Sequence, residues 1–562
     1  MGGVVSSMEH LDTLPKRLQY LSEEDPNKEL YVFYNDGVRD AYTSRELFTL
    51  AGRFAHRIRQ QGFQKGDVIA NTLPNSPERL ITDVGIVMAG CVTMNGQVLL
   101  ADGSDVFRSA KVARCRAVLV SDEGPGWRLI QRFLSKEAQA GCLFPLDIVE
   151  APEMKSAIVI SRGDPHFLDD IRNGSKETFV SPSEPEDLMI VLTTSGSTGY
   201  SKLVPRCHQD IISQSLMHSQ LRSPDLTWPK PSDKRFVYYS DRMMGWTGGI
   251  SFYSLCQADT RVLQDLFHAP RDTASELWRA VEAENCEVCG FLPLELENVL
   301  ERLRTSGRLP VNRKLKTIIT GGQPIRKSQL QSFFTLAETV FLGYGSTEVP
   351  CVTRQFLKEE TFESYNCGKV LDGLSVKICR DDGEECQVNE IGTLFVRGFS
   401  VFRGYFNQLE NPNPQNQKAF TPDGWFNTED YGYFDEADDL YVLGRVKDVI
   451  MYGAFVFYPG WMERKLLEHP DVLEAIIVPV TDPVLYHNIC ACIKLRQDSG
   501  LDEDKLKDYC DTIFLPEMST ALTPKPKYFI IMKDNFPETA TGKPDKQLLK
   551  RMAEDMFGYS GK

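Results

Sequence analysis

A run of hydroxyl-bearing residues and glycines is the first feature of the sequence that could do chemistry. In "TTSGSTGYSK" every residue from Thr193 to Gly199 is Thr, Ser or Gly, and a lysine follows at Lys202. Small residues let backbone N–H groups converge on an anion, hydroxyl groups add donors, and a lysine supplies a positive charge for phosphate. We therefore expect a phosphate-binding loop made of Thr194, Ser195, Gly196, Ser197, Thr198, Gly199 and Lys202.

The alternative for such a run is a flexible linker, and the flanking residues argue against it. The preceding "DLMIVLT" is short and apolar, as expected of a buried strand, and "KLVPRCHQDIISQSLMH" indicates a strand followed by a helix. Two familiar patterns do not fit. Lys202 lacks the preceding Gly of a Walker loop, and neither Ser195 nor Ser197 has the flanking glycines of a nucleophile elbow.

Four further segments give the loop its context: "GYGSTE" (343–348), "GWFNTED" (424–430), "GRVKD" (444–448) and "PETATGK" (537–543). Together with the loop, and in this order, they resemble the adenylate-forming superfamily of acyl- and aryl-CoA ligases, peptide-synthetase adenylation domains and beetle luciferases. The resemblance covers most of the chain. Each segment alone is a weak signal, and the identification depends on five segments in family order.

The resemblance implies an enzyme that activates a carboxylic acid with ATP, using Mg²⁺, and transfers the acyl group to coenzyme A. In that chemistry a carboxylate attacks the α-phosphate, and donors and a metal ion stabilise the charge that develops on the phosphate oxygens. The phosphate loop with Lys202 would hold the β- and γ-phosphates. Glu348 would be the Mg²⁺ ligand, because this hard cation prefers oxygen donors.

The remaining roles also follow from the resemblance. Tyr344 would stack on adenine, and Thr347 would contact the α-phosphate. Asp430 would accept hydrogen bonds from the ribose hydroxyls, with Arg445 beside it. Lys543 would bridge the substrate carboxylate and the nucleotide, so that the predicted catalytic residues are Lys543, Lys202 and Thr347.

The sequence departs from common family patterns at several positions. Glu429 stands where many members have a glycine before the ribose-binding aspartate, and Met451 stands near a lysine of the luciferase-like members, which argues against luciferase-like oxidation. Leu203 follows the loop lysine, and "KLVPR" is similar to aryl-acid-activating ligases. Their usual His-Asn pair is replaced by "YYSDRMMGWTGGI". In that segment Trp246, Gly248 and Gly249 would shape a pocket for a short, medium-chain or aryl acid.

The resemblance implies an acyl-CoA synthetase of the AMP-forming acid–thiol ligase class, with a role in fatty acid metabolism. Three alternatives stay open. The enzyme could be an aryl-acid ligase, it could pass the acyl group to a separate carrier protein, or the chain could be a binding or scaffold protein that kept the fold without the chemistry.

The pattern of secondary structure predicts an α/β fold. Apolar strands such as 67–75, 116–122 and 315–322 alternate with helices such as 44–63, which we expect to begin with Ser44 as N-cap and to close at Gly62. We predict a large domain, residues 1–443, with parallel-type sheets, crossover helices and a small β-rich subdomain (366–443). A small, mobile α+β domain, 444–562, would swing about Lys447.

Composition narrows the partners and the compartment. The 562 residues carry a net charge of −15, which argues against non-specific binding to nucleic acid. Among 14 scattered cysteines, Cys286 and Cys289 form a lone C-x-x-C that we interpret as buried thiols, and Cys490 and Cys492 share one face of a strand.

We expect an intracellular, cytoplasmic protein without a transmembrane segment. Gly2 in "MGGVVS" fits a myristoylation pattern, which would give weak membrane contact.

Overall fold

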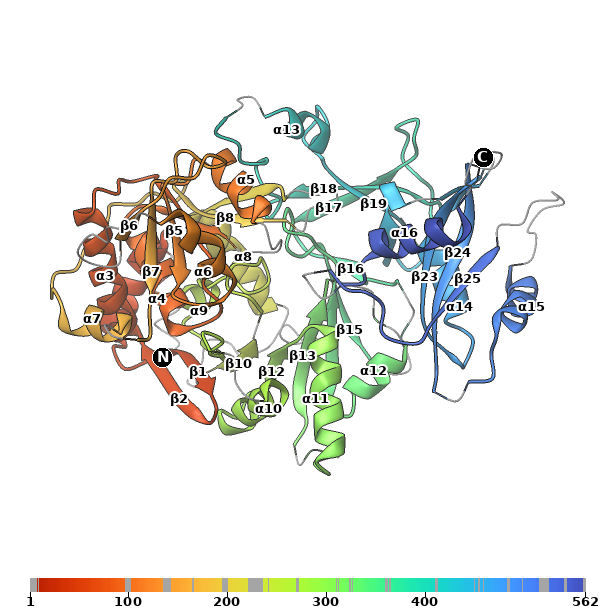
Figure 1. The fold of residues 1–562 in the computed structure, drawn as a ribbon, viewed down its shortest axis with the longest axis horizontal. Helices are drawn as coiled ribbons and strands as arrows, with labels where there is room; N and C mark the ends of the chain where they lie inside the picture. The colour runs from red at the N-terminus through yellow and green to blue at the C-terminus, as the bar shows by residue number, and fades with distance from the viewer. Residues whose placement is uncertain are drawn as a thin grey trace. The chain divides into compact units, whose positions relative to one another are not determined.

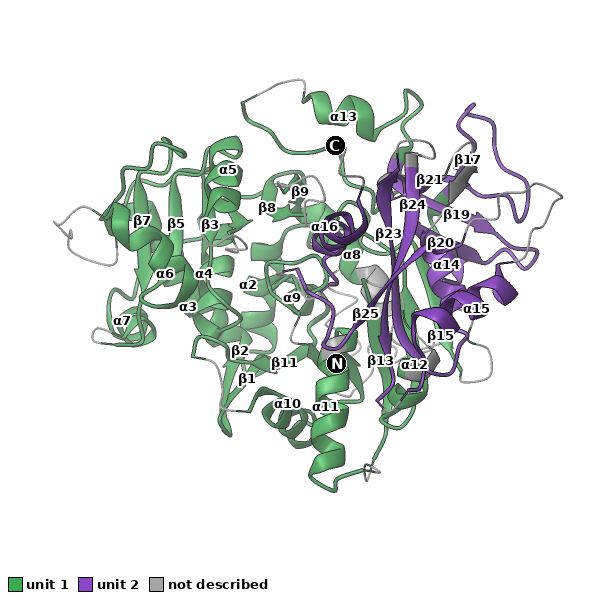
Figure 2. Cartoon of the chain, turned by 45° about the vertical axis from the view of Figure 1, so that its right-hand side comes forward, with its two compact units in different colours: residues 1–362, 370–375, 397–426 green, residues 363–369, 376–396, 427–562 purple. Residues whose placement is uncertain are grey.

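The computed structural model describes most of the chain, namely residues 8, 10–96, 103–134, 143–163, 166–194, 201–220, 236–240, 242–268, 272–309, 311, 313–322, 325, 327–358, 362, 365–409, 413–448, 450–452, 455–457, 459–482, 486–497, 499–514, 525–539 and 543–558. These residues form two compact units, shown in Figure 2. The first unit contains residues 1–362, 370–375 and 397–426. The second contains residues 363–369, 376–396 and 427–562.

The first unit contains a seven-stranded sheet in the order β6-β7-β5-β3-β4-β8-β9. Its strands are β3 (Val68–Asn71), β4 (Val92–Asn95), β5 (Ala117–Ser121), β6 (Leu143–Pro145), β7 (Ser156–Ile160), β8 (Leu188–Thr193) and β9 (Leu203–Cys207). The five central strands are parallel, and only the edge strands β6 and β9 run antiparallel to their neighbours. The expected parallel sheet is therefore confirmed, with antiparallel strands at its two edges.

A nine-stranded sheet has the order β16-β15-β14-β13-β12-β10-β11-β1-β2. Its strands are β1 (Glu29–Asn35), β2 (Val38–Thr43), β10 (Val237–Ser240), β11 (Thr260–Gln264), β12 (Val288–Gly290), β13 (Leu315–Gly321), β14 (Ala337–Gly343), β15 (Thr353–Leu357) and β16 (Lys369–Val370). From β1 and β11 to β14 the neighbouring strands are parallel. Gly321 and Gly343 are partners in register at the carboxyl ends of β13 and β14.

The helices of the first unit mostly connect consecutive strands of the two large sheets, as Figure 1 shows. They are α2 (Leu14–Glu24), α3 (Ser44–Gln60), α4 (Pro77–Met88), α5 (Ser104–Val112), α6 (Gly124–Ile130), α7 (Phe167–Asn173), α8 (His208–Gln220), α9 (Tyr253–Gln257), α10 (Thr273–Ala283), α11 (Pro293–Thr305), α12 (Lys327–Phe333) and α13 (Pro414–Ala419), with the 3₁₀ turn η1 (Gln131–Phe133). The N-cap of α3 is Thr43, which forms a capping box with Glu46, so the prediction of Ser44 was wrong by one residue.

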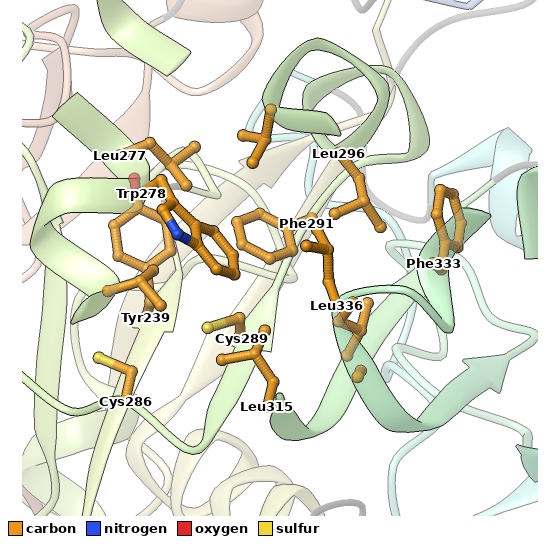
Figure 3. Packing of buried hydrophobic residues seen from close by; sticks show 14 of the residues in the cluster. Tyr239, Leu277, Trp278, Cys286, Cys289, Phe291, Leu296, Leu315, Phe333 and Leu336 are labelled. Carbon is orange, nitrogen blue, oxygen red and sulfur yellow. The ribbon is translucent and has the colours of Figure 1, made fainter. Parts of the chain in front are cut away.

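The core beside β10, β12 and β13 is built from large apolar side chains, shown in Figure 3. Tyr239, Trp278 and Phe291 are completely or almost completely buried there. Cys286 and Cys289 lie in the same cluster, so the interpretation of this pair as buried thiols is confirmed. A thiol in this position acts as a small apolar side chain.

The second unit contains two sheets. A four-stranded sheet, β17-β18-β19-β20, is made of β17 (Leu374–Cys379), β18 (Gly392–Gly398), β19 (Phe426–Phe434) and β20 (Leu440–Arg445), so that the first residues of β17 and β19 and the last of β18 belong to the first unit. The turn η3 (Val446–Asp448) leads to a five-stranded sheet with three helices. These elements are β21 (Ile450–Tyr452), β22 (Phe455–Phe457), α14 (Pro459–Leu466), β23 (Val472–Asp482), β24 (Tyr486–Leu495), α15 (Glu503–Ile513), β25 (Tyr528–Met532) and α16 (Lys546–Phe557).

The α+β character of the carboxyl-terminal part is thus confirmed. Cys490 and Cys492 lie two residues apart on β24 and are both buried in one apolar cluster, as the alternation predicts. Among the described residues, no helix is long and apolar enough to cross a membrane. Gly2 lies outside the described residues, so its myristoylation stays a prediction, as does the intracellular location.

Candidate functional site

The two ends of the predicted phosphate loop are held together. Strands β8 and β9 pair in antiparallel fashion, with Thr193 opposite Leu203. The backbone N–H of Thr194 donates to the carbonyl of Lys202 at 3.0 Å, and the N–H of Lys202 donates to Oγ1 of Thr194 at the same distance. The chain therefore leaves and re-enters the sheet at neighbouring positions. Ser195, Gly196, Ser197, Thr198 and Gly199 lie outside the described residues.

The "GYGSTE" segment follows β14 as a tightly folded loop. The backbone N–H of Tyr344 donates to Oγ1 of Thr353, and its carbonyl accepts from Val352 N–H at 2.7 Å. A Cβ at Gly345 would lie 2.3 Å from the carbonyl oxygen of Pro350, so the close approach of the backbone requires glycine there. Tyr344, Thr347 and Glu348 are all half-buried, and Glu348 lies in a bend and not at the start of a helix.

Lys202 and Glu348 are linked through Tyr405, for which the sequence alone predicted no role. The Tyr405 hydroxyl donates to Oε1 of Glu348 at 2.8 Å and accepts from Nζ of Lys202 at 3.4 Å. The Lys202 ammonium also lies 4.8 Å from the centroid of the Tyr405 ring, a cation–π contact. We call Lys202, Tyr405 and Glu348 the Glu348 cluster. It places a cation and a carboxylate of the predicted site side by side within the first unit.

Arg206 holds the loop that carries Thr347 and Glu348. Its guanidinium donates to the carbonyls of Thr347 at 3.0 Å, Glu348 at 2.9 Å and Ser400 at 3.2 Å. The side chain is only 1% exposed. Because a buried guanidinium is costly unless its donors are used, these bonds link the loop firmly to β9. Arg206 is the last residue of "KLVPR", and the sequence alone predicted no role for it.

In the second unit, Asp430 and Arg445 are cross-strand partners on β19 and β20. Nε of Arg445 lies 3.0 Å from Oδ1 of Asp430, and its Nη1 donates to the carbonyl of Thr428. The expected neighbourhood of these two residues is therefore present. Glu429 is exposed and has a φ of 59°, the left-handed region that favours glycine. This backbone conformation explains why a glycine suits the position better than a glutamate.

Lys543 and Lys546 are three residues apart and differ in their surroundings. Lys543 is exposed, in a loop closed by bonds from the backbone N–H and Oγ1 of Thr539 to its carbonyl. Nζ of Lys546 donates to Oε1 of Glu463 at 3.2 Å, and the Tyr365 hydroxyl donates to Oε2 at 3.5 Å. We call Lys546, Tyr365 and Glu463 the Glu463 cluster. It belongs wholly to the second unit.

Residues 242–251, with the predicted pocket residues, form a loop that buried groups hold in place. The Arg261 guanidinium donates to the carbonyls of Ser240, Arg242 and Gly249 at 2.5–3.0 Å. A Cβ at Gly249 would lie 2.3 Å from the carbonyl oxygen of Met243, whereas one at Gly248 would meet nothing within 4 Å. The space beside Gly249 is thus occupied by backbone, and only Gly248 faces open space. Trp246 is half-buried.

Two predicted features are only partly described. Lys447 lies in the turn η3, and its side chain is outside the described part of the chain, as is that of Met451. For Mg²⁺, no cluster of three acidic, histidine or cysteine side chains occurs among the described residues. Glu348 alone still suits this ion, because Mg²⁺ is commonly held by one carboxylate with substrate phosphates and water.

Comparisons with known proteins identify the family of this chain. The sequence model of the AMP-binding enzyme family matches residues 18–406, and that of the AMP-binding enzyme C-terminal domain matches residues 462–543. The chain belongs to the AMP-binding enzyme family. The prediction of an adenylate-forming enzyme of the acyl- and aryl-CoA ligase type is thereby confirmed.

Among curated relatives, the chain is 24% identical to 4-coumarate–CoA ligase 3 of Oryza sativa subsp. japonica, over 90% of this chain and 89% of that protein. It is also 24% identical to the mitochondrial medium-chain acyl-CoA ligase ACSF2 of Mus musculus, over 99% and 90% of the two chains. The crystal structure of ATP-bound MatB from Rhodopseudomonas palustris has a TM-score of 0.76 at 21% identity, covering 97% and 99% of the chains. That likeness supports the predicted fold class.

Proposed function

We propose that this protein is an ATP-dependent carboxylic acid–CoA ligase that acts through an acyl-adenylate on a compact acid, of short or medium chain length or with a ring. The Glu348 cluster is the observation that supports this most strongly. A lysine at the end of a phosphate-type loop and a carboxylate suited to a metal ion are linked by one phenol hydroxyl. Reactions at phosphate need both kinds of charge close together.

The proposed chemistry has two steps. In the first, a carboxylate oxygen of the acid attacks the α-phosphorus of ATP, a new O–P bond forms, and the bond to the β-phosphate breaks to release pyrophosphate. In the second, the thiol sulfur of coenzyme A attacks the acyl carbonyl, loses its proton, and AMP leaves. Mg²⁺ bound at Glu348 would neutralise charge on the phosphate oxygens and on the leaving pyrophosphate.

The other predicted residues keep their proposed roles. Lys202 would bind the phosphates, Thr347 the α-phosphate, and Tyr344 the adenine ring. Asp430 would accept hydrogen bonds from the ribose hydroxyls. Nε of Arg445, 3.0 Å from Oδ1 of Asp430, would orient this carboxylate. Lys543 is exposed, and its ammonium would contact the substrate carboxylate.

We also propose that residues 444–562 act as a separate domain that rotates about Lys447 between the two steps. Two features of the chain support this proposal. The short turn η3 (Val446–Asp448) connects β20 to the carboxyl-terminal sheet. The two family models match separate parts of the chain, residues 18–406 and 462–543, and Lys447 lies between them.

The rigidity of the loop at 242–251 supports a size limit on the acid. Besides Arg261, the Ser251 hydroxyl donates to Oδ2 of Asp83 at 3.0 Å, and the backbone N–H of Met244 donates to Oδ1 of Asn75 at 2.8 Å. An aromatic wall carried on such a loop cannot move aside easily. An added methylene group that fits contributes about 0.8 kcal/mol, and one that clashes costs more than that.

Trp246 provides the test of this limit. We expect kcat/KM of the wild type to fall steeply beyond a certain chain length, and Trp246→Ala to move that limit toward longer acids. The matched variant Trp425→Ala, at a half-buried tryptophan elsewhere in the first unit, should leave the profile unchanged. A wild type that is fastest on long-chain acids would contradict the pocket assignment.

The function itself is tested by measuring pyrophosphate release over a panel of straight-chain and aryl acids, with and without coenzyme A. We expect acid-dependent release and, with coenzyme A, formation of the acyl thioester and AMP. Acid-dependent release without a thioester would favour a carrier protein as acceptor. ATP binding without acid-dependent release for any acid would favour the binding or scaffold alternative. Faster pyrophosphate release with aryl acids than with straight-chain acids would favour the aryl-acid ligase, the alternative that "KLVPR" suggests.

A further inference from the structure

Tyr405 belongs to a segment that connects both halves of the proposed nucleotide site. The backbone N–H of Phe402 donates to the carbonyl of Glu348, and that of Phe406 donates to the carbonyl of Leu203, next to Lys202, both at 2.8 Å. The segment is thus paired at one end with the loop of the metal ligand and at the other with the strand after the phosphate loop. Tyr405 lies between these two attachments.

Its backbone is fixed from the other side as well. The N–H of Tyr405 donates to Oδ1 of Asn416 at 2.7 Å, and its carbonyl accepts from Nδ2 of Asn413 at 3.0 Å. Gly404 has a φ of +125°, and a Cβ there would lie 2.8 Å from Nδ2 of Asn416. The Tyr405 ring packs against Phe402 with a centroid distance of 4.7 Å, and the side chain is 5% exposed. The position of its hydroxyl is therefore set by the fold.

We propose that Tyr405 is a positioning residue that holds the Glu348 carboxylate and the Lys202 ammonium in place for the nucleotide. A lysine and a glutamate in direct contact would form an ion pair, which the incoming phosphates and metal ion would have to break. The phenol offers each of them a neutral partner instead, because its oxygen accepts from Nζ while its hydrogen goes to Oε1. This inference rests on the proposed roles of Lys202 and Glu348.

The consequence is specific to the metal ion. Removing the hydroxyl leaves Lys202 over the ring and leaves the phosphate loop unchanged, so that binding of the metal-free nucleotide should be nearly unaffected. The carboxylate loses its orienting bond, and loss of such a partner commonly reduces metal affinity by roughly 10- to 100-fold. The expected signature is a smaller gain in nucleotide affinity on adding Mg²⁺.

The experiment measures binding of α,β-methylene-ATP, which cannot release pyrophosphate, by isothermal titration calorimetry of the full chain with Mg²⁺ and with EDTA. Tyr405→Phe should lower the Mg²⁺ enhancement of affinity by about tenfold and change the affinity in EDTA by less than about twofold. Because the ring and its packing are kept, we expect the variant to fold, and its thermal unfolding midpoint checks this.

Tyr34→Phe is the matched control. Tyr34 is also 5% exposed, and its hydroxyl donates to Oε1 of Glu284 at the same 2.8 Å. It lies on β1 of the nine-stranded sheet, whereas the phosphate loop follows β8 of the seven-stranded sheet. This variant should leave the Mg²⁺ enhancement unchanged. A loss as large as that of Tyr405→Phe would show that any buried tyrosine–glutamate bond has this effect, and the inference would be overturned.

Glu348→Gln separates the inference from the function on which it rests. If this variant removes the Mg²⁺ enhancement while Tyr405→Phe keeps it within about twofold of the wild type, the role of Tyr405 is refuted and that of Glu348 stands. If Glu348→Gln keeps the full enhancement, Glu348 is not the metal ligand, and both proposals fail together. The double variant should be no worse than Glu348→Gln alone, because the hydroxyl acts through the carboxylate.

Discussion

The Glu348 cluster of the first unit and the Glu463 cluster of the second contain the same three residue types, a lysine, a tyrosine and a glutamate. They are connected differently. In the Glu348 cluster the tyrosine oxygen lies between the lysine and the carboxylate. In the Glu463 cluster the ammonium of Lys546 contacts the carboxylate directly at 3.2 Å, and the backbone N–H of Ile477 also donates to it at 3.0 Å.

We interpret this difference as one between a proposed ligand site, the Glu348 cluster, and a cluster that stabilises the fold, the Glu463 cluster. The Glu463 carboxylate is 12% exposed and receives three donors from its own unit. Although its partial burial lowers the pKa of Lys546, attraction to Glu463 and Asp448 raises that pKa above its usual value, as expected for a charge with acidic partners within the protein. The Glu348 carboxylate, among the described residues, has the Tyr405 hydroxyl as its side-chain donor.

Replacing Lys543, three residues before Lys546, should have the largest effect on catalysis. Lys543→Ala removes the cation proposed for the developing charge, and loss of one such donor typically costs about a hundredfold in rate or more. We expect acid-dependent pyrophosphate release to fall by at least that factor, while thioester formation from supplied acyl-adenylate is largely retained. The free energy of unfolding should stay within about 0.5 kcal/mol of the wild type, because the side chain is exposed.

A Lys543→Ala variant with normal pyrophosphate release would contradict the proposed role. It would also remove the distinction between Lys543 and Lys546, since both would then be lysines without a part in the chemistry. The half-reaction assays must be normalised to folded protein, measured by circular dichroism, so that a loss of fold is not mistaken for a loss of catalysis.

Lys546→Met should act on stability instead. Methionine keeps much of the apolar stem and leaves Glu463 without its cation. Because the Lys546 side chain is 40% exposed, solvent moderates the cost, and we expect the free energy of unfolding to fall by about 1–2 kcal/mol. The matched variant Lys202→Met should not lower it measurably. Chemical denaturation measures the stability of both variants, and pyrophosphate release per folded molecule measures their catalysis. A Lys202→Met variant that loses stability, or a Lys546→Met variant that loses only catalysis, would contradict the distinction between the two clusters.

Much of the fold could be predicted from local patterns. The apolar strands at 68–71, 117–121, 188–193 and 315–321 appear where runs of Val, Ile and Leu end in turn residues, since such runs favour buried parallel strands. The antiparallel direction of the edge strands β6 and β9 was not expected. Whether two strands pair in parallel or antiparallel fashion depends on contacts between distant segments, so a local sequence pattern does not predict it.

Residues of the candidate site could be proposed from the sequence where family segments are contiguous, but not where contacts join distant residues. Tyr405 lies 57 residues after Glu348 and 203 after Lys202, in "FRGYF", which shows no periodicity that points to a site. Glu429 illustrates the opposite limit. The sequence shows that a glutamate replaces the common glycine at this position. The positive φ that makes glycine the more suitable residue is visible only in the folded backbone.

Tyr365→Phe gives the smallest expected effect and the sharpest comparison with Tyr405→Phe. Burial and the Glu463 carboxylate raise the pKa of Tyr365 well above its usual value, so the hydroxyl stays protonated and donates to Oε2. At 3.5 Å this bond is long, and its loss should cost no more than about 0.5–1 kcal/mol in the free energy of unfolding. The Mg²⁺ enhancement of nucleotide affinity should not change, because the Glu463 carboxylate has no proposed part in binding the ion. Calorimetry and denaturation of the two phenylalanine variants, carried out side by side, measure both quantities. If Tyr365→Phe lowered the Mg²⁺ enhancement as much as Tyr405→Phe, then identical residue types would behave alike despite their different connections, and the division between a ligand site and a structural cluster would be wrong.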